Sequence, residues 1–277
     1  MESKELSIVI VTFKSELKIF DCLKAIPKNI KVIVVENSNN DFFKKDLEKK
    51  YDNVDCILAG ENKGYATANN IGLSNVHTKF ALVLNPDAIL EKNAIKNFLE
   101  TANRYDDFWL IGPGNDQVVD LNFSNSDTIE VENLKGFAIF FNRQKFNGKF
   151  FDENFFLYFE EIDLCKNVKK NKGKIYLSQN ILIKHEGGSS ANELKKNELE
   201  KNRNWHWMWS TFYFHKKYKG FFLALIIILP KLLSSLIKTV FYWITLNKDK
   251  RNIYYCRLSG ILNSIIGKKS WYRPPLD

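Results

Sequence analysis

The chain has 277 residues, 45% hydrophobic and 26% charged, so it is long enough for one large domain or for a domain with an appendage. Its 22 Phe and 11 Tyr residues favour a folded chain over a disordered one. The four cysteines are far apart and form no CxxC pair. This excludes an obvious zinc site or disulfide framework and favours free thiols in a reducing compartment.

The net charge of +9 is concentrated in the C-terminal part of the chain. Residues 1–200 carry 27 basic and 30 acidic side chains, a balance of −3, whereas residues 201–277 carry 14 basic and 2 acidic side chains, a balance of +12. The division predicts one domain over 1–200 and a basic tail with a separate role over 201–277. The N-terminus shows no signal-peptide pattern, so we expect a cytoplasmic location.

Short apolar runs alternate with helical patterns in the first half of the chain. The strands expected there are 6–13, 31–36, 54–59 and 80–84, and the helices are 15–25, 41–51, 65–75 and 92–105. Further on, we expect strands at 108–111, 137–142 and 174–177 and a helix at 162–171. Such alternation predicts an α/β fold with a mixed, mostly parallel sheet flanked by helices.

Polar residues follow each of the first four expected strands, where ligands bind in an open α/β sheet. These strand ends are Thr12-Phe13-Lys14, Glu36 to Asp41, Gly60 to Gly64 and Asn85-Pro86-Asp87. Any one of them alone is typical of a turn. Four on consecutive strands favour a single binding crevice.

Asp87 is the strongest candidate for a metal ligand in this crevice, because it follows a buried strand and a proline that fixes the local backbone. One carboxylate combined with phosphate oxygens is a typical arrangement for Mg²⁺ or Mn²⁺. The alternative is that Asp87 caps a following helix. His185 lies in a polar loop with Gly187 and Gly188, and this setting makes it a candidate ligand of a metal or a phosphate.

Three carboxylates, Glu160, Glu161 and Asp163, follow directly after the aromatic run FDENFFLYF. Carboxylates crowded beside apolar surface tend to have raised pKa values, which suits a general base. The alternative is acidity at a helix N-terminus, where it interacts favourably with the helix dipole.

Taken in order over residues 6 to 190, these motifs resemble the inverting glycosyltransferases of family 2, and within it the bacterial rhamnosyltransferase-like branch. The matching segments are VTF, VVENSNND, ENKGYATANNIG, LNPDAIL, GFAIFFNR, FDENFFLYFEEIDLC and HEGGSS. The resemblance implies a GT-A fold (a Rossmann-like sheet), a nucleotide-diphosphate sugar donor such as dTDP-rhamnose or a UDP-sugar, and a divalent metal, Mg²⁺ or Mn²⁺. It also implies a glycan acceptor, carried on a lipid, in the synthesis of a cell-surface polysaccharide.

The resemblance carries roles over to individual positions of this chain. The residues expected around the nucleotide sugar are Thr12, Phe13, Glu36, Asn62, Lys63, Gly64, Asn69, Asn85 and Asp87. Asp87 and His185 would hold the metal, and Glu161 would be the catalytic base. Positions 36 and 161 hold Glu where the family usually has Asp, so Asp163 and then Glu160 remain alternative bases. The implied mechanism is a single displacement that inverts the sugar.

The tail contains an apolar run at 221–229, which Pro230 and Lys231 interrupt before the apolar pattern resumes at 232–244. Polar residues recur there every three or four positions, which predicts an amphipathic helix. A membrane span needs about 18 or more uncharged residues, and a lysine at mid-bilayer costs roughly 2.5–3.5 kcal/mol. The tail, with its flanking basic and aromatic residues, therefore predicts peripheral attachment to the inner face of the plasma membrane.

Other interpretations remain open at this point. The tail could form a helical hairpin buried in a homodimer interface, whereas nucleic acid is disfavoured because no recognised module for it is present. The whole chain could be a nucleotidyltransferase, although residues 12–15 form no glycine-rich triphosphate loop. It could also be a membrane-associated carbohydrate- or nucleotide-binding protein with a degenerate site.

Overall fold

The computed structural model describes residues 5–114, 126–185 and 196–273. These residues divide into two compact units. An α/β unit is drawn from residues 1–152 and 160–190, and a helical unit from residues 153–159 and 191–277. The segment Glu153–Phe159 thus belongs to the helical unit, although the chain returns to the α/β unit at Glu160.

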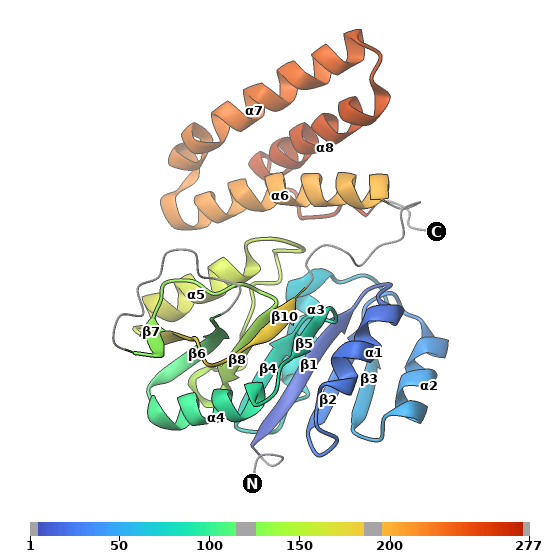
Figure 1. The fold of residues 1–277 in the computed structure, drawn as a ribbon. Helices are drawn as coiled ribbons and strands as arrows, with labels where there is room; N and C mark the ends of the chain where they lie inside the picture. The colour runs from blue at the N-terminus through green and yellow to red at the C-terminus, as the bar shows by residue number, and fades with distance from the viewer. Residues whose placement is uncertain (1–4, 115–125, 186–195, 274–277) are drawn as a thin grey trace. The chain divides into compact units, whose positions relative to one another are not determined.

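An eight-stranded sheet forms the centre of the α/β unit (Figure 1). In spatial order its strands are β3 (Val54–Leu58), β2 (Lys31–Glu36), β1 (Leu6–Thr12), β4 (Phe80–Leu84), β8 (Ala138–Asn142), β6 (Phe108–Pro113), β9 (Lys174–Ser178) and β7 (Thr128–Glu130). The first four strands are parallel, β8 is antiparallel to both of its neighbours, β6 and β9 are parallel, and β7 is antiparallel to β9. The predicted mostly parallel α/β fold is confirmed.

Helices cover both faces of this sheet. Those on one face are α1 (Glu16–Lys24), α2 (Asp41–Lys50) and α4 (Ala94–Arg104), and those on the other are α3 (Gly64–Ser74) and α5 (Glu160–Lys170). A short 3-10 helix, Arg143–Lys145, follows β8. Most expected boundaries agree with the structure within two residues, and β2 and β4 have the expected bounds.

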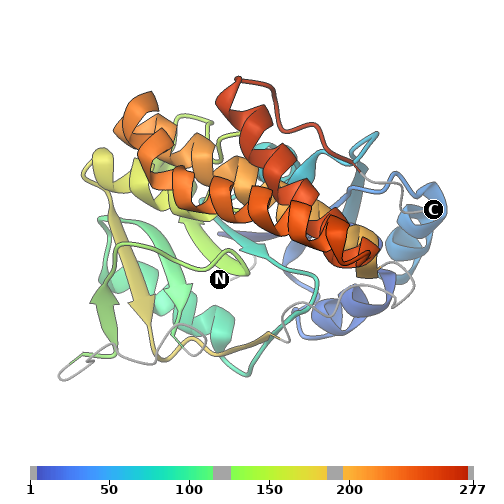
Figure 2. The ribbon, with the colours of Figure 1, turned by 90° about the horizontal axis from the view of Figure 1, so that it is seen from above.

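Three helices form most of the helical unit and pack on one another (Figures 1 and 2). They are α6 (Lys196–Lys219), α7 (Phe221–Ile244) and α8 (Lys248–Ile265). Helix α7 runs continuously through Pro230. Proline removes one helical hydrogen bond, but the buried side chains of Ala224, Ile228 and Ser235 anchor the turns on either side of it.

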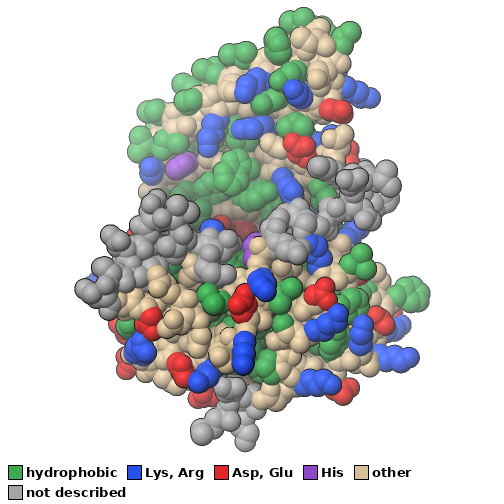
Figure 3. Space-filling model, viewed as in Figure 1, with side chains coloured by type: hydrophobic (Ala, Val, Ile, Leu, Met, Phe, Trp, Pro, Cys, Tyr) green, Lys and Arg blue, Asp and Glu red, His purple; other side chains and the backbone are tan. Residues whose placement is uncertain are grey.

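The rest of α7 exposes large apolar side chains, and hydrophobic atoms are visible along it in Figure 3. Within the described parts of the chain, α7 is also the one helix that is long and apolar enough to cross a membrane, judged by length and composition alone. Its mean hydropathy is 2.1 over an 18-residue window, of which 17% is buried.

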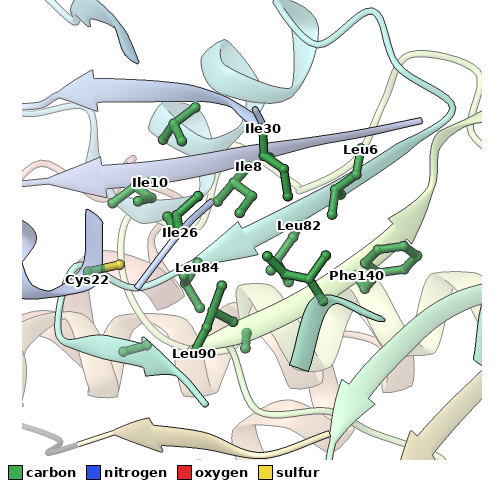
Figure 4. Packing of buried hydrophobic residues seen from close by; sticks show 14 of the residues in the cluster. Leu6, Ile8, Ile10, Cys22, Ile26, Ile30, Leu82, Leu84, Leu90 and Phe140 are labelled. Carbon is green, nitrogen blue, oxygen red and sulfur yellow. The ribbon is translucent and has the colours of Figure 1, made fainter. Parts of the chain in front are cut away.

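Period-two alternation along the strands builds the two cores of the α/β unit. On β1, Leu6, Ile8 and Ile10 face the layer of α1, α2 and α4, where Figure 4 shows them packed with Leu82 and Leu84 of β4. The alternate side chain of the same strand, Val9, faces α3 and α5. Both sides of β1 are therefore buried apart from the half-buried Val11, as expected of a central parallel strand.

A second, two-stranded sheet of β5 (Ala88–Leu90) and β10 (Ile183–His185) was not expected from the sequence. The strands are antiparallel, with Ala88 opposite His185 and Leu90 opposite Ile183. Each has three residues, which is too short for an alternating pattern to be recognised. The pairing joins the turn after β4 to a segment near the end of the α/β unit.

Candidate active site

The carboxyl ends of β1, β2 and β3 lie side by side. Thr12 is opposite Glu36 in the strand register, and Glu36 is opposite Leu58. β4 flanks β1 on its other side and leads into Asn85. Thr12 is fully buried, and its Oγ1 atom has no hydrogen-bond partner among the described residues, while the neighbouring Phe13 is half-buried. The structure thus brings the predicted strand ends to one edge of the sheet.

The Glu36 carboxylate is buried and engaged by the loop that follows it. Its Oε1 atom accepts hydrogen bonds from the backbone N–H of Ser38 at 3.0 Å and from the Ser38 hydroxyl. Its Oε2 atom accepts from the backbone N–H of Asn40 at 2.6 Å. Glu36 therefore holds the shape of the loop between β2 and α2.

Asn37 links this loop to the loop after β3, and the sequence did not single it out. Its Oδ1 atom accepts from the backbone N–H of Lys63 at 2.8 Å, and its Nδ2 atom donates to Asn62 Oδ1 at 3.1 Å. Asn62 Oδ1 in turn accepts from the backbone N–H of Gly64 at 3.1 Å. Asn37, only 2% exposed, thereby fixes the three loop residues that were predicted to contact the nucleotide.

Asn69 on α3 is another buried predicted residue. Its Nδ2 atom donates to the Tyr65 carbonyl at 3.0 Å, but its Oδ1 atom has no hydrogen-bond partner in the described chain. A buried carbonyl oxygen without a partner is costly. Asn69 and Thr12 thus each have a buried polar atom without a hydrogen-bond partner among the described residues.

Asp87 and His185 come together next to the small sheet. His185 Nε2 lies 3.4 Å from Asp87 Oδ1, and the two side chains are 17% and 9% exposed. The His185 ring also stacks on Phe137, with centroids 4.5 Å apart and planes at 12°. Burial raises the pKa of Asp87, but the hydrogen bond and charge of His185, aided by the charge of Lys18, outweigh it and hold that pKa below its usual value.

The turn that carries Asp87 is fixed on both sides. The backbone N–H of Asn85 donates to the Phe137 carbonyl at 2.8 Å, and the N–H of Ala88 donates to the Asn85 carbonyl at 3.1 Å. The chain then enters β5, and the next helix, α4, has Asn93 in front of its first residue. The alternative interpretation of Asp87 as a helix cap is therefore wrong.

The carboxylates Glu160 and Glu161 are the first two residues of α5, so this helix begins earlier than expected. Glu160 is 5% exposed, and its Oε2 atom has no hydrogen-bond partner among the described residues. Burial and the charge of Glu161 raise the pKa of Glu160 well above its usual value. Burial also raises the pKa of Glu161, which is half-buried. Asp163, on the same helical turn, is buried as well.

Tyr65 and Gly136 complete the surroundings of this acidic pair. The Tyr65 hydroxyl donates to the Gly136 carbonyl. A Cβ atom placed on Gly136 would lie 3.6 Å from Cβ of Glu161 and 3.7 Å from the Tyr65 hydroxyl oxygen. Burial, with the charges of Glu160 and Glu161, raises the pKa of Tyr65 well above its usual value. Glu161 thus lies against a glycine backbone and a neutral phenol.

The predicted residues therefore form two groups, one at the strand ends and one at the start of α5. Gly187 and Gly188, expected near a diphosphate, lie outside the described residues. Nowhere in the described chain do three His, Cys, Asp or Glu side chains gather as a metal cluster. Asp87 and His185 still fit two positions around one divalent ion, because ligands at about 2.0–2.2 Å from a metal lie about 3 Å apart.

A mixed, mostly parallel sheet with helices on both faces and polar residues after its first strands is the architecture predicted above for a GT-A fold. The profile of Glycosyl transferase family 2 matches residues 7–165. The chain belongs to this family.

Two curated relatives are enzymes of glycan and teichoic acid assembly by name. The chain is 26% identical to the low-salt glycan biosynthesis hexosyltransferase Agl10 of Haloferax volcanii over 193 residues, which are 60% of this chain and 62% of the relative. It is 33% identical to the teichoic acid poly(glycerol phosphate) polymerase of Staphylococcus epidermidis over 110 residues, 37% of this chain and 15% of the relative. The matches thus span less than two thirds of either relative.

Solved structures share the fold. S. aureus TarS 1-349 in complex with UDP has a TM-score of 0.55 and 16% identity, over 97% of this chain and 93% of that one. The mannosyltransferase PcManGT from Pyrobaculum calidifontis, in complex with GDP-Man and Mn²⁺, has a TM-score of 0.56 and 10% identity, over 96% and 88%. The predicted GT-A fold is confirmed.

Proposed function

We propose that the protein is a metal-dependent, inverting glycosyltransferase that moves a sugar from a nucleotide-diphosphate sugar to a hydroxyl of a lipid-linked glycan. The observation that carries this proposal is the position of Glu161, half-buried against Gly136 and beside Tyr65, with a pKa raised by burial. A carboxylate with a raised pKa is better matched to proton transfer near neutral pH.

The donor's nucleotide would occupy the strand ends. Thr12 Oγ1 and Asn69 Oδ1 are buried atoms without protein partners and would gain partners from a bound nucleotide. Asn37 holds Asn62, Lys63 and Gly64 in place for the same ligand. The solved neighbours in complex with UDP, UDP-GlcNAc and GDP-Man support a nucleotide sugar, such as dTDP-rhamnose or a UDP-sugar, as the donor.

Asp87 and His185 would hold the divalent metal, Mg²⁺ or Mn²⁺. Oxygen and nitrogen donors 3.4 Å apart suit such an ion, and diphosphate oxygens would complete its coordination. When bound, the ion stabilises negative charge on the departing diphosphate. The structures of GalNAc-T7 and PcManGT contain Mn²⁺ and support this part of the proposal.

In the proposed mechanism, ionised Glu161 accepts the proton of an acceptor hydroxyl as that oxygen attacks the anomeric carbon. The bond from this carbon to the diphosphate oxygen breaks, and one displacement inverts the configuration. No enzyme nucleophile takes part. Burial and the charge of Glu161 raise the pKa of Glu160 well above its usual value, which favours a neutral Glu160 beside the ionised base. Asp163 is the second candidate for the base.

The acceptor would be reached at a membrane surface, on the inner face of the plasma membrane. Ile226, Leu233, Ile237 and Val240 are exposed and recur at helical spacing on α7. Ala224, Ile228 and Ser235, which are buried, lie on the opposite side of the helix. Such a stripe suits insertion into the boundary between headgroups and acyl chains.

Basic side chains flank this stripe at both ends of α7. Those before it are Lys216, Lys217 and Lys219, and those after it are Lys248, Lys250 and Arg251. Each basic residue close to an anionic bilayer contributes about 1 kcal/mol of attraction. The combination favours peripheral attachment, with Lys231 and Lys238 on the polar side of the helix.

A donor panel tests the proposal. The full chain is incubated with dTDP-rhamnose, UDP-glucose, UDP-GlcNAc or GDP-mannose and a lipid-linked glycan, with Mn²⁺ or with chelator, and released nucleoside diphosphate is measured. We expect metal-dependent release with one donor, an inverted linkage by NMR, and loss of release in Glu161→Gln. Nucleotide binding without release would favour a binding protein, and release of sugar 1-phosphate would favour a nucleotidyltransferase. A retained configuration would contradict the single displacement.

A further inference from the structure

Two consecutive residues directly before α5 have a left-handed backbone. Tyr158 has φ of 70° and Phe159 has φ of 72°, and both carry bulky aromatic side chains. This region is disfavoured for any residue with a Cβ atom and persists only where the surroundings hold it. The residue that follows is Glu160, the first of α5.

The segment Glu153–Phe159, called here the aromatic segment, is held by α6 within the helical unit. Its ring contacts, with centroid distances, are Phe155 on Tyr213 (4.9 Å), Phe156 on His206 (4.4 Å), Tyr158 on Trp207 (5.2 Å), and Phe159 on Trp207 (5.4 Å) and Phe214 (5.2 Å). In addition, the Ser210 hydroxyl donates to the Leu157 carbonyl at 2.9 Å.

The partners on α6 are spaced as neighbours on one helix face. They are His206, Trp207, Ser210, Tyr213 and Phe214. α6 itself is anchored near this face, because the His206 ring contacts the Ser270 hydroxyl at 2.8 Å and the Tyr272 carbonyl at 2.9 Å. The aromatic segment is therefore fixed along about two turns of a helix that is itself fixed.

Trp207 is the side chain of α6 that we single out, because of its contacts with the left-handed turn and its exposure. Its ring contacts both left-handed residues, Tyr158 and Phe159. It is also 44% exposed, so it is not needed to fill the core of the helical unit. Its packing therefore acts mainly on the turn.

We propose that Trp207 and Phe159 are positioning residues for the catalytic base. Packing on α6 imposes the left-handed turn, and this turn sets the direction in which the chain enters α5. A rotation about φ of residue 159 moves Glu160 and Glu161 directly, since they follow it in the chain. The inference rests on the proposed function, in which Glu161 accepts the acceptor's proton.

The donor site depends on the strand ends and not on this turn. Loss of the turn should therefore lower kcat for transfer and leave donor affinity nearly unchanged. A residue that only stabilises the helical unit would instead lower the melting temperature with no such separation. Measuring kcat and the donor's KM therefore distinguishes a residue that positions the base from one that only stabilises the helical unit.

The first test compares Phe159→Ala with Phe159→Gly. Both lose the ring, but glycine adopts positive φ without penalty whereas alanine does not. We expect kcat of Phe159→Ala to lie about fivefold or more below that of Phe159→Gly. The donor's KM should stay within about twofold of wild type in both, as for a group not used in donor binding. Equal kcat values in the two variants would overturn the role of the left-handed turn.

The second test compares Trp207→Ala with Trp207→Phe. It can still decide the question if the Phe159 variants do not fold. The phenylalanine keeps a ring for Tyr158 and Phe159, so it should restore most of the kcat lost in the alanine variant. Tyr255→Ala, which removes an exposed aromatic from α8, is the matched control with wild-type kcat. Normal kcat in Trp207→Ala, with Glu161→Gln inactive, would refute this inference alone. Full activity of Glu161→Gln would refute the proposed function instead.

Discussion

His185 Nε2 lies 3.4 Å from Asp87 Oδ1, and the pairing of His185 with Ala88 in a two-stranded sheet holds it there. The two residues come from distant parts of the chain. Phe137 stacks on the His185 ring and accepts, through its carbonyl, the N–H of Asn85. One residue thus fixes both the imidazole and the turn that carries the carboxylate.

Asp87→Asn should abolish most of the transfer activity while the fold is kept. The amide has the same size but is a much weaker metal ligand, so charge on the leaving diphosphate would be poorly stabilised. We expect kcat/KM to fall roughly 100-fold or more, a typical cost of losing such stabilisation. The measurement is nucleoside diphosphate release over a Mn²⁺ titration. Asp55→Asn, at an exposed site paired with Lys31, is the control. Full activity of Asp87→Asn in excess chelator would contradict the metal site.

Glu160→Gln should stabilise the protein at neutral pH. The pKa of Glu160 is raised well above its usual value of 4.5 by burial and by Glu161. The stability that it contributes is therefore fully present below pH 4.5 and is lost as pH rises through the raised pKa. Folding of wild type at pH 7 must either add a proton to Glu160 or bury its charge, and glutamine requires neither. The melting temperature of Glu160→Gln should therefore exceed that of wild type at pH 7, by about 2–4 °C for each kcal/mol.

A melting series from pH 3.5 to pH 8 checks this expectation. The two curves should converge on the acidic side, where Glu160 is protonated in both the folded and the unfolded chain. A constant difference across the whole pH range would show that the effect comes from packing and not from the charge.

Asn37→Ala should weaken nucleotide binding through the loop that it holds. The substitution leaves the N–H of Lys63 without its acceptor and frees Asn62, at a cost of about 1–3 kcal/mol. We expect roughly tenfold weaker binding of the nucleoside diphosphate by titration calorimetry. Asn53→Ala removes a side-chain hydrogen bond to the Ile30 carbonyl at the opposite end of the sheet. It should lower stability and leave nucleotide affinity intact, and equal losses of affinity in both variants would count against the prediction.

The sequence predicted the bounds of the large strands, and thereby which residues lie at their carboxyl ends, for physical reasons. Lys31–Glu36 and Phe80–Leu84 are runs of apolar residues rich in β-branched or aromatic side chains, which is typical of buried parallel strands. Glu160 and Glu161 could be identified because they follow an aromatic run directly and stand close to a third carboxylate, Asp163. Each of these patterns lies within a short stretch of the chain, so it can be recognised in a single sequence.

Other features depend on contacts between distant residues and leave no local pattern. β10 is three residues long and exists because β5 offers it a partner. Asn37 is one of several asparagines that follow β2, and asparagine is common in turns. Its sequence position therefore gives no sign of its role. The left-handed turn at Tyr158 and Phe159 is hidden because positive φ is normally signalled by glycine, and here aromatic packing on α6 replaces it.

Gly72→Ala should destabilise the α/β unit much more than Gly136→Ala. A Cβ atom on Gly72 would lie 2.3 Å from Cγ1 of Val9, at the contact of α3 with β1, so the helix would have to shift. Such overpacking costs about 1–3 kcal/mol. On Gly136 the same atom meets its neighbours at ordinary contact distances of 3.6 and 3.7 Å. Thermal unfolding of the two variants measures the difference, and equal melting temperatures would mean that α3 packs less closely than described.

The apolar stripe of α7 should decide membrane attachment. Ile226→Glu and Ile237→Glu each place a charge on an exposed position of the stripe, where wild type exposes 66% and 65% of an isoleucine. Burial of one such side chain is worth about 1.5–3 kcal/mol, so each change should reduce binding to anionic vesicles about tenfold or more. Phe42→Glu makes the same kind of change at an exposed position of α2 and should bind vesicles as wild type does. If the stripe were instead covered by a second copy of the chain, the α7 variants would turn a dimer into a monomer on gel filtration, and wild type would not sediment with vesicles.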